Sequence, residues 1–218
     1  GTPKRGDLIP LSPAPPAQED RLGLSPAAGL SWEGFQDVLP GEQTVGTVVC
    51  GTLDQGELGT RGVGDESGQR VRHTFFAFAQ EEAQRYRGTL AFFGADGILM
   101  LFMQEAHAPR AVRAALGLQR RVQDAVIALD TQRASAGTMR LGMHTGPLVV
   151  PQVMDPPGWT SFTTSESTTV AVWLHDLALP ATLLTSKVTL PFIHEMVQWA
   201  EHGAVRIPGL ADPLMAYR

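Results

Sequence analysis

Apolar residues fall into two kinds of stretch along the chain, short continuous runs and longer stretches in which apolar and polar positions alternate every three or four residues. The runs at 44–50, 89–93 and 98–103 are rich in β-branched, aromatic and other apolar residues, which is typical of buried strands. The turn at 94–97 joins the last two runs, so they are predicted to form a hairpin. Similar runs predict further strands at 139–144, 148–150, 181–184, 203–207 and 215–217, with a turn at 145–147.

The longer stretches predict helices. Between residues 109 and 131 apolar residues recur at spacings of three and four, and Pro109 occupies a first helical position, where its missing N–H costs nothing. Further helices are predicted at 71–87, 170–177 and 186–199, the last interrupted by Pro191. Helices and hairpins alternate in an order that indicates an α+β fold of ferredoxin-like type, a mixed and mostly antiparallel sheet with helices on one face.

Two segments differ from this pattern. Residues 1–43 are rich in Pro, Ala and Gly and cannot bury enough apolar surface to offset the entropy lost on ordering. They are predicted to be a linker whose last part, from Trp32 to Leu39, docks on a domain formed by residues 44–218. The Gly-rich stretch 51–68 predicts a loop, and it lacks the GxxxxGK[ST] pattern of a phosphate-binding loop.

Net charge, apolar run length and cysteine content limit the partners and the cellular location expected for this chain. The net charge of -5 argues against nucleic acid or an anionic membrane as a partner, because both favour a basic surface. The longest strongly apolar run, Ile98 to Met103, is far shorter than the ~20 residues of a spanning helix, so no membrane span is expected within this chain. Cys50 is the single cysteine and is expected to be a buried hydrophobe. A cytoplasmic protein without disulfides is therefore expected.

Isolated polar residues point to no familiar site. The six histidines show no metal-ligand spacing such as HExxH, and no GxSxG nucleophile motif occurs. The arginines on the predicted helix 109–131 are interpreted as a solvated face, with a partner surface as the alternative. These arginines are Arg110, Arg113, Arg120 and Arg121.

Four stretches, taken together and in this order, resemble the class III adenylate/guanylate cyclase catalytic domain. They are FGADGILMLF at 93–102, HAPRAVRAALGLQ at 107–119, MRLGMHTGPLVV at 139–150 and IPGLADPLMAY at 207–217. The resemblance spans residues 45 to 218. It implies the nucleotidyl cyclase fold, a homodimer or a pairing with a homologous domain, and active sites at the dimer interface. It also gives His144 a structural role near the end of the sheet.

The family reaction implied by the resemblance is attack of a ribose 3′-hydroxyl on the α-phosphate of ATP or GTP, with release of pyrophosphate. Two aspartates hold two divalent metals, and the partner subunit contributes base-reading and transition-state residues. Carried over position by position, most of these residues are replaced. Thr52 stands for the first metal aspartate, Asp96 for the second, Phe92 for the base-reading lysine, Glu166 for the base-reading acid, Thr169 for the asparagine and Trp173 for the arginine.

These replacements favour a degenerate cyclase domain with little or no activity, which acts as a regulatory, dimerisation or nucleotide-sensing module of a larger signalling protein. No cofactor is then expected. The alternative is a divergent active cyclase that uses Mg²⁺ or Mn²⁺, with Asp54 and Asp96 as the metal-binding pair, since Asp54 lies two residues beyond Thr52 and so on the same face of a strand. Asp96 also suits a simple hairpin turn.

Overall fold

The computed structural model describes residues 43–54, 66–93, 97–129, 138–149 and 165–218. Its elements follow one another along the chain as β1 (Gln43–Asp54), α1 (Glu66–Arg85), β2 (Thr89–Phe93), β3 (Gly97–Met103), α2 (His107–Leu129), β4 (Thr138–Val149), α3 (Glu166–Leu177), β5 (Thr182–Ser186), the 3-10 helix η4 (Leu190–Phe192), β6 (Glu201–Val205) and β7 (Leu214–Tyr217). Most elements predicted from the sequence are found, with ends shifted by a few residues. The linker 1–43 and its docking part lie, up to residue 42, outside the described residues, so that division of the chain stays a prediction.

The strands form one seven-stranded sheet in the order β2-β3-β1-β4-β5-β7-β6. All neighbouring pairs are antiparallel except β4 and β5, which are parallel. The two longest strands, β1 and β4, pair over their full length at the centre of the sheet, from Gln43 with Val149 to Asp54 with Thr138. The prediction of a mixed, mostly antiparallel sheet in an α+β fold is therefore confirmed.

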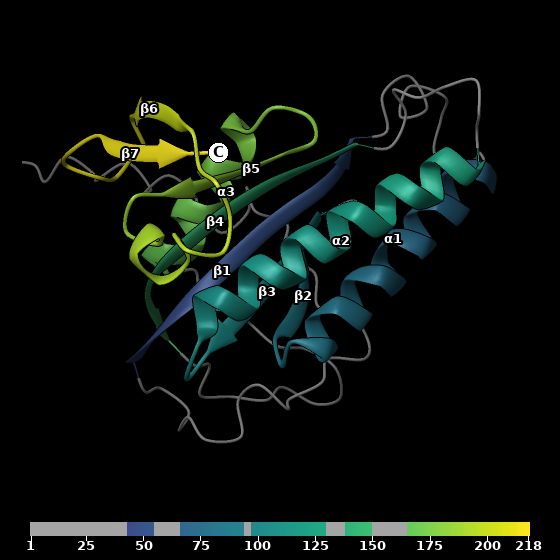
Figure 1. Ribbon diagram of the computed structural model, residues 1–218, viewed down its shortest axis with the longest axis horizontal. Coiled ribbons are helices and arrows are strands. Elements are labelled where there is room, and N and C mark those ends of the chain that lie inside the picture. Colours follow the sequence, from purple (N-terminus) through teal and green to yellow (C-terminus); the bar gives the residue numbers. More distant parts are fainter. Residues whose placement is uncertain (1–42, 55–65, 94–96, 130–137, 150–164) are drawn as a thin grey trace, which may run out of the picture.

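Helices cover both faces of the sheet, which corrects the prediction of helices on one face. Figure 1 shows α1 and α2 side by side in front of β1, β2 and β3, with α3 behind β4 and β5. The approach of α3 is very close at Gly142 of β4, where an added Cβ would lie 2.2 Å from both the carbonyl oxygen of Ala171 and the amide nitrogen of His175. Alternate residues of β1 and β4 therefore face different helices.

The face covered by α1 and α2 holds the main apolar core. Strand residues Val49, Ile98, Phe102 and Leu141 are almost fully buried there, against alanines, valines and leucines of α2 and the aromatic face of α1. The spacing of three and four in α2 places its apolar side chains along one stripe, which explains why this stretch forms a helix on the sheet.

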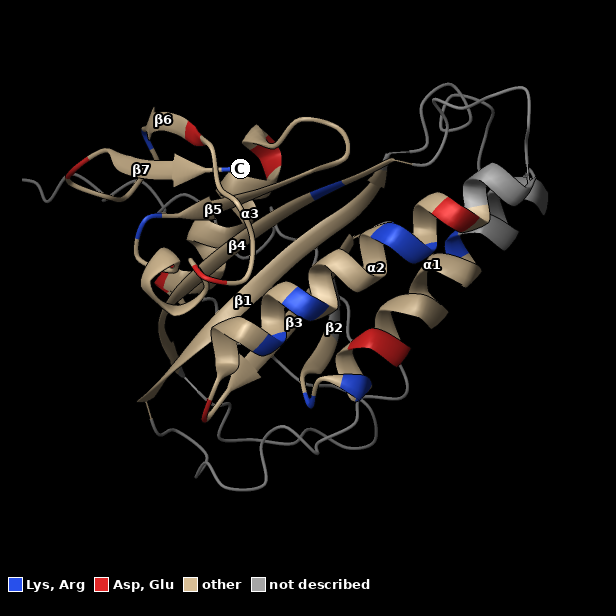
Figure 2. Cartoon of the chain, in the orientation of Figure 1, with Lys and Arg blue, Asp and Glu red and all other residues tan. Residues whose placement is uncertain are grey.

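Two arginines of α2 are tied to neighbouring elements, so the expectation of a solvated arginine face is wrong for them. Arg121 contacts Glu81 at 2.5 Å and Glu82 at 3.2 Å, and its guanidinium stacks on Phe78 of α1. Arg110 donates hydrogen bonds to backbone carbonyls that include those of residues 86 and 87 at 3.0 and 2.9 Å. Arg113 and Arg120 remain exposed, and Figure 2 shows the basic residues spaced along α2.

The predicted hairpin at 139–150 is instead one continuous strand. Residues 145 to 147 were expected to turn, but Thr145, Gly146 and Pro147 pair with Thr47, Gly46 and Val45 of β1. On its other side β4 pairs with β5 only through residues 140 to 143. Pro147 therefore lies beyond this pairing, where its missing N–H removes no hydrogen bond to a described strand.

The predicted helix at 186–199 is also not formed. The chain there makes turns around η4, and Pro191 is its second residue. Ile193 is the anchor of this segment in the main core, while Lys187 donates its backbone N–H to the carbonyl of Met215. Cys50, predicted to be a buried hydrophobe, is fully buried in β1, and burial raises the pKa of its thiol. No helix in the described parts of the chain is both long and apolar enough to cross a bilayer.

Candidate functional site

Helix α3 and the end of β1 bring together the polar residues of the second sheet face. α3 begins after Ser165, whose hydroxyl accepts a hydrogen bond from the backbone N–H of Thr168 and caps the helix. Its sheet-facing side is formed by buried residues such as Ala171 and His175. Gly142 lets the helix lie close enough for the imidazole of His175 to reach the strand beneath.

A hydrogen-bonded chain of three side chains starts at Thr52, the position that the resemblance assigns to the first metal aspartate. Thr52 Oγ1 lies 2.7 Å from His175 Nε2, and His175 Nδ1 lies 2.9 Å from Asp176 Oδ1. A carboxylate only accepts hydrogen bonds, so Nδ1 carries the hydrogen and Nε2 accepts the proton of the Thr52 hydroxyl. The threonine is half-buried, the imidazole is 8% exposed, and the carboxylate is 55% exposed.

Electrostatics keep this imidazole neutral near pH 7. Burial is the largest cause and lowers the pKa of His175, Asp176 acts in the opposite direction, and the charge of Arg140 adds a smaller lowering effect. Arg140 lies directly opposite Thr52 in the pairing of β1 with β4, so both side chains are on the α3 face. A neutral imidazole is the form that can accept a proton from a hydroxyl.

Two other hydroxyl–imidazole contacts occur in the described part of the chain. Thr47 Oγ1 lies 2.8 Å from His107 Nδ1 and 2.7 Å from Thr145 Oγ1. His144 Nδ1 lies 2.7 Å from Ser186 Oγ, and burial lowers the pKa of His144 to about 4. Within the described residues neither of these imidazoles is hydrogen-bonded to a carboxylate, which distinguishes them from His175.

The residues carried over to α3 lie on the side of the helix that faces away from the sheet. Glu166, Thr169 and Trp173 are spaced by three and four residues, and all are exposed or half-buried. Trp173 is 36% exposed and Leu177, one turn later, is 40% exposed. Thr52 and Trp173 are thus on opposite sides of α3, so one chain does not bring these two positions together.

The other predicted site residues are only partly described. β1 continues as a strand to Asp54, which pairs with Thr138, and Phe92 of β2 pairs with Ile98 of β3. The side chains of Asp54 and Phe92 and the whole of Asp96 lie outside the described residues. The predicted loop at 51–68 is wrong for residues 51–54, which belong to β1, and for residues 66–68, which begin α1. β1 thus runs on to Asp54, as the carboxylate-pair alternative requires.

Sequence reasoning missed His175 and Asp176. The two residues are adjacent, but His175 and Thr52 are 123 positions apart, and only the packing of α3 on β1 makes them partners. The available signal was the helical period of 170–177, which places residue 175 on the same side as the apolar positions 171 and 174. A histidine on the buried side of a helix calls for a polar partner on the surface that the helix covers.

The described residues do not fit a two-metal centre. Among them no group of three or more His, Cys, Asp and Glu side chains is arranged to hold a metal ion. Thr52 has a neutral hydroxyl that is already hydrogen-bonded to His175. Hard dications such as Mg²⁺ favour carboxylate oxygens as ligands. A metal at this site would therefore depend on Asp54 and Asp96.

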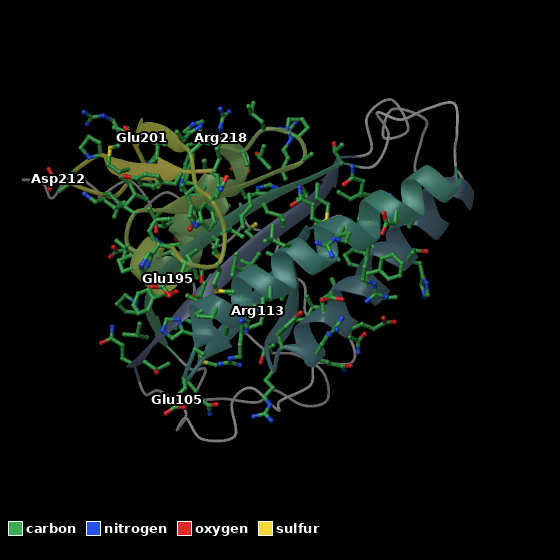
Figure 3. All side chains as sticks on the ribbon, viewed as in Figure 1. Glu105, Arg113, Glu195, Glu201, Asp212 and Arg218 are labelled. Atoms are coloured by element: carbon green, nitrogen blue, oxygen red, sulfur yellow. The ribbon has the colours of Figure 1, made fainter. Side chains whose placement is uncertain are left out.

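A separate cavity of about 270 Å³ lies between α2, the start of β5 and the segment after η4. Its walls include Leu116, Gln119, Leu183, Trp199 and Arg218, so it shares no residue with the chain at Thr52. Figure 3 labels Arg218 at this end of the molecule, with Glu195, Glu201 and Asp212 at the periphery. The cavity is small compared with pockets that enclose a nucleotide-sized ligand.

Comparison with solved structures gives the identity of the fold. The adenylyl cyclase CyaB from P. aeruginosa is similar over 81% of this chain and 93% of its own, with a TM-score of 0.71 and 17% sequence identity. The guanylyl cyclase Cya2 is similar over 82% of this chain and 93% of its own, with a TM-score of 0.67 and 21% identity. The chain has the fold of a class III nucleotidyl cyclase catalytic domain.

A third similar structure is the dimeric guanylyl cyclase domain of the RhoGC fusion protein from Blastocladiella emersonii, with a TM-score of 0.66 and 14% identity over 81% of this chain and 96% of that one. No protein-family model and no curated protein matches the sequence. The cyclase fold is thus retained here at sequence identities that do not by themselves carry function.

Proposed function

We propose that this chain is a catalytically impaired or inactive cyclase-like domain that serves as a regulatory, dimerisation or nucleotide-sensing module of a larger signalling protein. The observation that carries the proposal is the hydrogen bond of Thr52 to His175. Where the resemblance expects a metal-binding carboxylate, the chain has a neutral hydroxyl that is hydrogen-bonded to His175. A hydroxyl in that position is a poor substitute for an anionic ligand of Mg²⁺ or Mn²⁺.

The outer side of α3 supports the same proposal. The resemblance assigns the asparagine and arginine of the partner's half-site to Thr169 and Trp173, and α3 contains no Asn and no Arg. Loss of one preorganised donor to a transition state typically lowers the rate by about 10²–10³. Losses at both halves of the site leave little cyclase activity, even though such effects are not additive.

Dimerisation is the partner interaction that this surface suits. Trp173 and Leu177 form an exposed apolar stripe on α3, and large aromatic residues are common at the centres of protein interfaces. The similar domain from Blastocladiella emersonii is described as dimeric. A second copy of this chain, or a homologous cyclase-like domain, is the partner that we propose.

The direct test is a cyclase assay on the purified chain with ATP or GTP and Mn²⁺, beside an active cyclase domain. Production of cyclic nucleotide is expected to be below about one thousandth of the active domain's, in line with the loss of at least one transition-state donor. Asp96→Ala should then change nothing measurable. Cyclic nucleotide formed at a comparable rate and abolished by Asp96→Ala would overturn the proposal, with Asp124→Ala, on the exposed side of α2, as the matched control.

A divergent active cyclase is the second candidate, because β1 continues to Asp54. If Asp54 and Asp96 bind the metals, Asp54→Asn and Asp96→Asn should each abolish both activity and Mn²⁺ binding by calorimetry. Retention of Mn²⁺ affinity in both variants would reject this candidate.

Nucleotide sensing has its own measurement. A ligand that binds the folded chain at about 100 times its dissociation constant stabilises it by about 2.7 kcal/mol, which shifts the melting temperature by several degrees. Absence of a shift with a panel of nucleoside triphosphates and cyclic nucleotides would remove sensing from the proposal and leave dimerisation.

A further inference from the structure

The chain Thr52–His175–Asp176 has the order of groups that activates a hydroxyl nucleophile. The carboxylate of Asp176 holds His175 Nδ1 at 2.9 Å and fixes the tautomer, and His175 Nε2 accepts the Thr52 proton at 2.7 Å. In enzymes with covalent catalysis the nucleophile, the base and a third orienting group are connected in this way. Thr52 itself is half-buried.

Arg140 contributes a positive charge on the same face of the sheet as Thr52. It lies opposite Thr52 across β1 and β4, where facing residues have Cβ atoms about 4.5–5.5 Å apart. Its charge already acts on the imidazole of His175, whose pKa it lowers. A guanidinium on the same sheet face as a nucleophile favours an electrophile with several anionic oxygens, and a phosphoryl group has that character.

The other two hydroxyl–imidazole contacts serve as internal references. Thr47 is fully buried beneath His107, and Ser186 is fully buried beside His144. In the described part of the molecule neither imidazole has a carboxylate on its second nitrogen. Thr52 is thus the one hydroxyl of the three that combines a base, an orienting acid and partial exposure.

We propose that Thr52 is a nucleophile that accepts a phosphoryl group from a small acyl phosphate, with His175 as the general base. The Thr52 oxygen forms a bond to phosphorus while the bond from phosphorus to the leaving oxygen breaks. The hydroxyl proton passes to His175 Nε2 and then to the leaving group or to solvent, and no electrons are transferred to an external acceptor. Asp176 positions the imidazole, and Arg140 balances the charge on the phosphoryl oxygens. The step involves no ribose, so its test is independent of whether the chain has cyclase activity.

The test uses acetyl phosphate with Mg²⁺ as the phosphodonor and tandem mass spectrometry of the digested full chain as the readout. Phosphate is expected on the peptide that contains Thr52, at the Thr52 side chain. Thr52→Ser keeps a hydroxyl and should retain labelling, whereas the nearly isosteric Thr52→Val should lose it. His175→Gln keeps a polar side chain on α3 and should slow labelling by about 10²–10⁴, the usual contribution of a general base.

Asp176→Asn should also slow labelling, and restoration of the wild-type rate by Asp176→Glu would support its positioning role. His107→Gln is the matched control, because it removes the imidazole beside Thr47 and should leave Thr52 labelling unchanged. An unmodified Thr52 in the wild-type chain would overturn the proposal. So would an acetyl group on Thr52 in place of phosphate, phosphate on Thr47, or labelling of folded His175→Gln at the wild-type rate, with circular dichroism to verify folding.

Discussion

The two faces of the sheet differ in the side chains that they present to the helices. Against α1 and α2 the sheet presents buried apolar residues such as Val49, Phe102 and Leu141. Against α3 the same strands present the polar Thr52 and His144 together with the buried Val48 and Cys50, and the apolar cluster around α3 and β5 is smaller. Burial of apolar area contributes stability without direction, whereas a buried polar group must find a specific partner.

This difference separates the part of the domain that maintains the fold from the part that carries its candidate chemistry. A core of apolar side chains tolerates sequence change provided that volume and pattern are kept. The α3 face holds two of the hydroxyl–imidazole contacts, and each depends on the position of two particular side chains.

The largest effect is expected from a truncation in the α1/α2 core. Phe102 is fully buried, so Phe102→Ala should lower the free energy of unfolding by about 3–5 kcal/mol, measured by urea denaturation. Phe192 is 48% exposed and makes a tilted ring contact with His107, and Phe192→Ala should lower the free energy of unfolding by less than about 1 kcal/mol. Equal losses from the two variants would contradict the assignment of this face as the main core.

Acid should act mainly on the polar face. His144 has a pKa of about 4 in the folded chain and near its ordinary value of 6.5 when unfolded, so the unfolded state binds more protons between these values. Stability should therefore be intact above pH 6.5 and fall by about 3 kcal/mol as the pH decreases to 4. The check is the free energy of unfolding in urea across this range.

Variant His144→Asn isolates this contribution, since it retains a polar group near Ser186 and has no proton to gain. Its unfolding free energy should depend less steeply on pH between 6.5 and 4 than that of the wild-type chain. If the unfolding free energies of the variant and of the wild-type chain fell equally with decreasing pH, His144 would not be responsible for the acid sensitivity.

Two glycine variants compare helix contacts on the two faces. An added Cβ at Gly142 would meet backbone atoms of Ala171 and His175 at 2.2 Å, which cannot move without shifting α3. Gly142→Ala should therefore destabilise by about 1–3 kcal/mol in urea denaturation. At Gly117 the nearest atom is Glu82 Oε2 at 2.5 Å, the end of a flexible side chain, so Gly117→Ala should cost less. The reverse order would contradict the tight seating of α3.

A small effect on folding is expected on the outer side of α3. Trp173→Ser removes a side chain that is 36% exposed and should lower the free energy of unfolding by about 1 kcal/mol, well below the effect of Phe102→Ala. If the stripe is the dimer surface, the same variant should raise the dimer dissociation constant at least about tenfold in analytical ultracentrifugation. Arg113→Ser, on the exposed side of α2, is the control and should leave association unchanged.

Much of the fold could be predicted because local pattern and tertiary environment agree. The hairpin of β2 and β3 and the long helix α2 were found within two residues of their predicted ends, since buried runs and helical spacing are properties of neighbouring residues. The predicted turn at 145–147 failed because a Gly-Pro pair that favours a turn locally is held in β4 by its pairing with β1. The predicted helix at 186–199 failed because Pro191 and the contacts of Ile193 outweigh the apolar spacing.

In the candidate site, too, some features follow from the sequence and others from the tertiary structure. The sequence alone determined that Thr52, Thr169 and Trp173 replace the residues expected from the resemblance, because residue identity at a position needs no coordinates. Only the tertiary structure decided that α3 crosses to the other face and that His175 meets Thr52. The reason is physical: a contact between residues 123 positions apart depends on the global packing of a helix on a sheet, which no local pattern records.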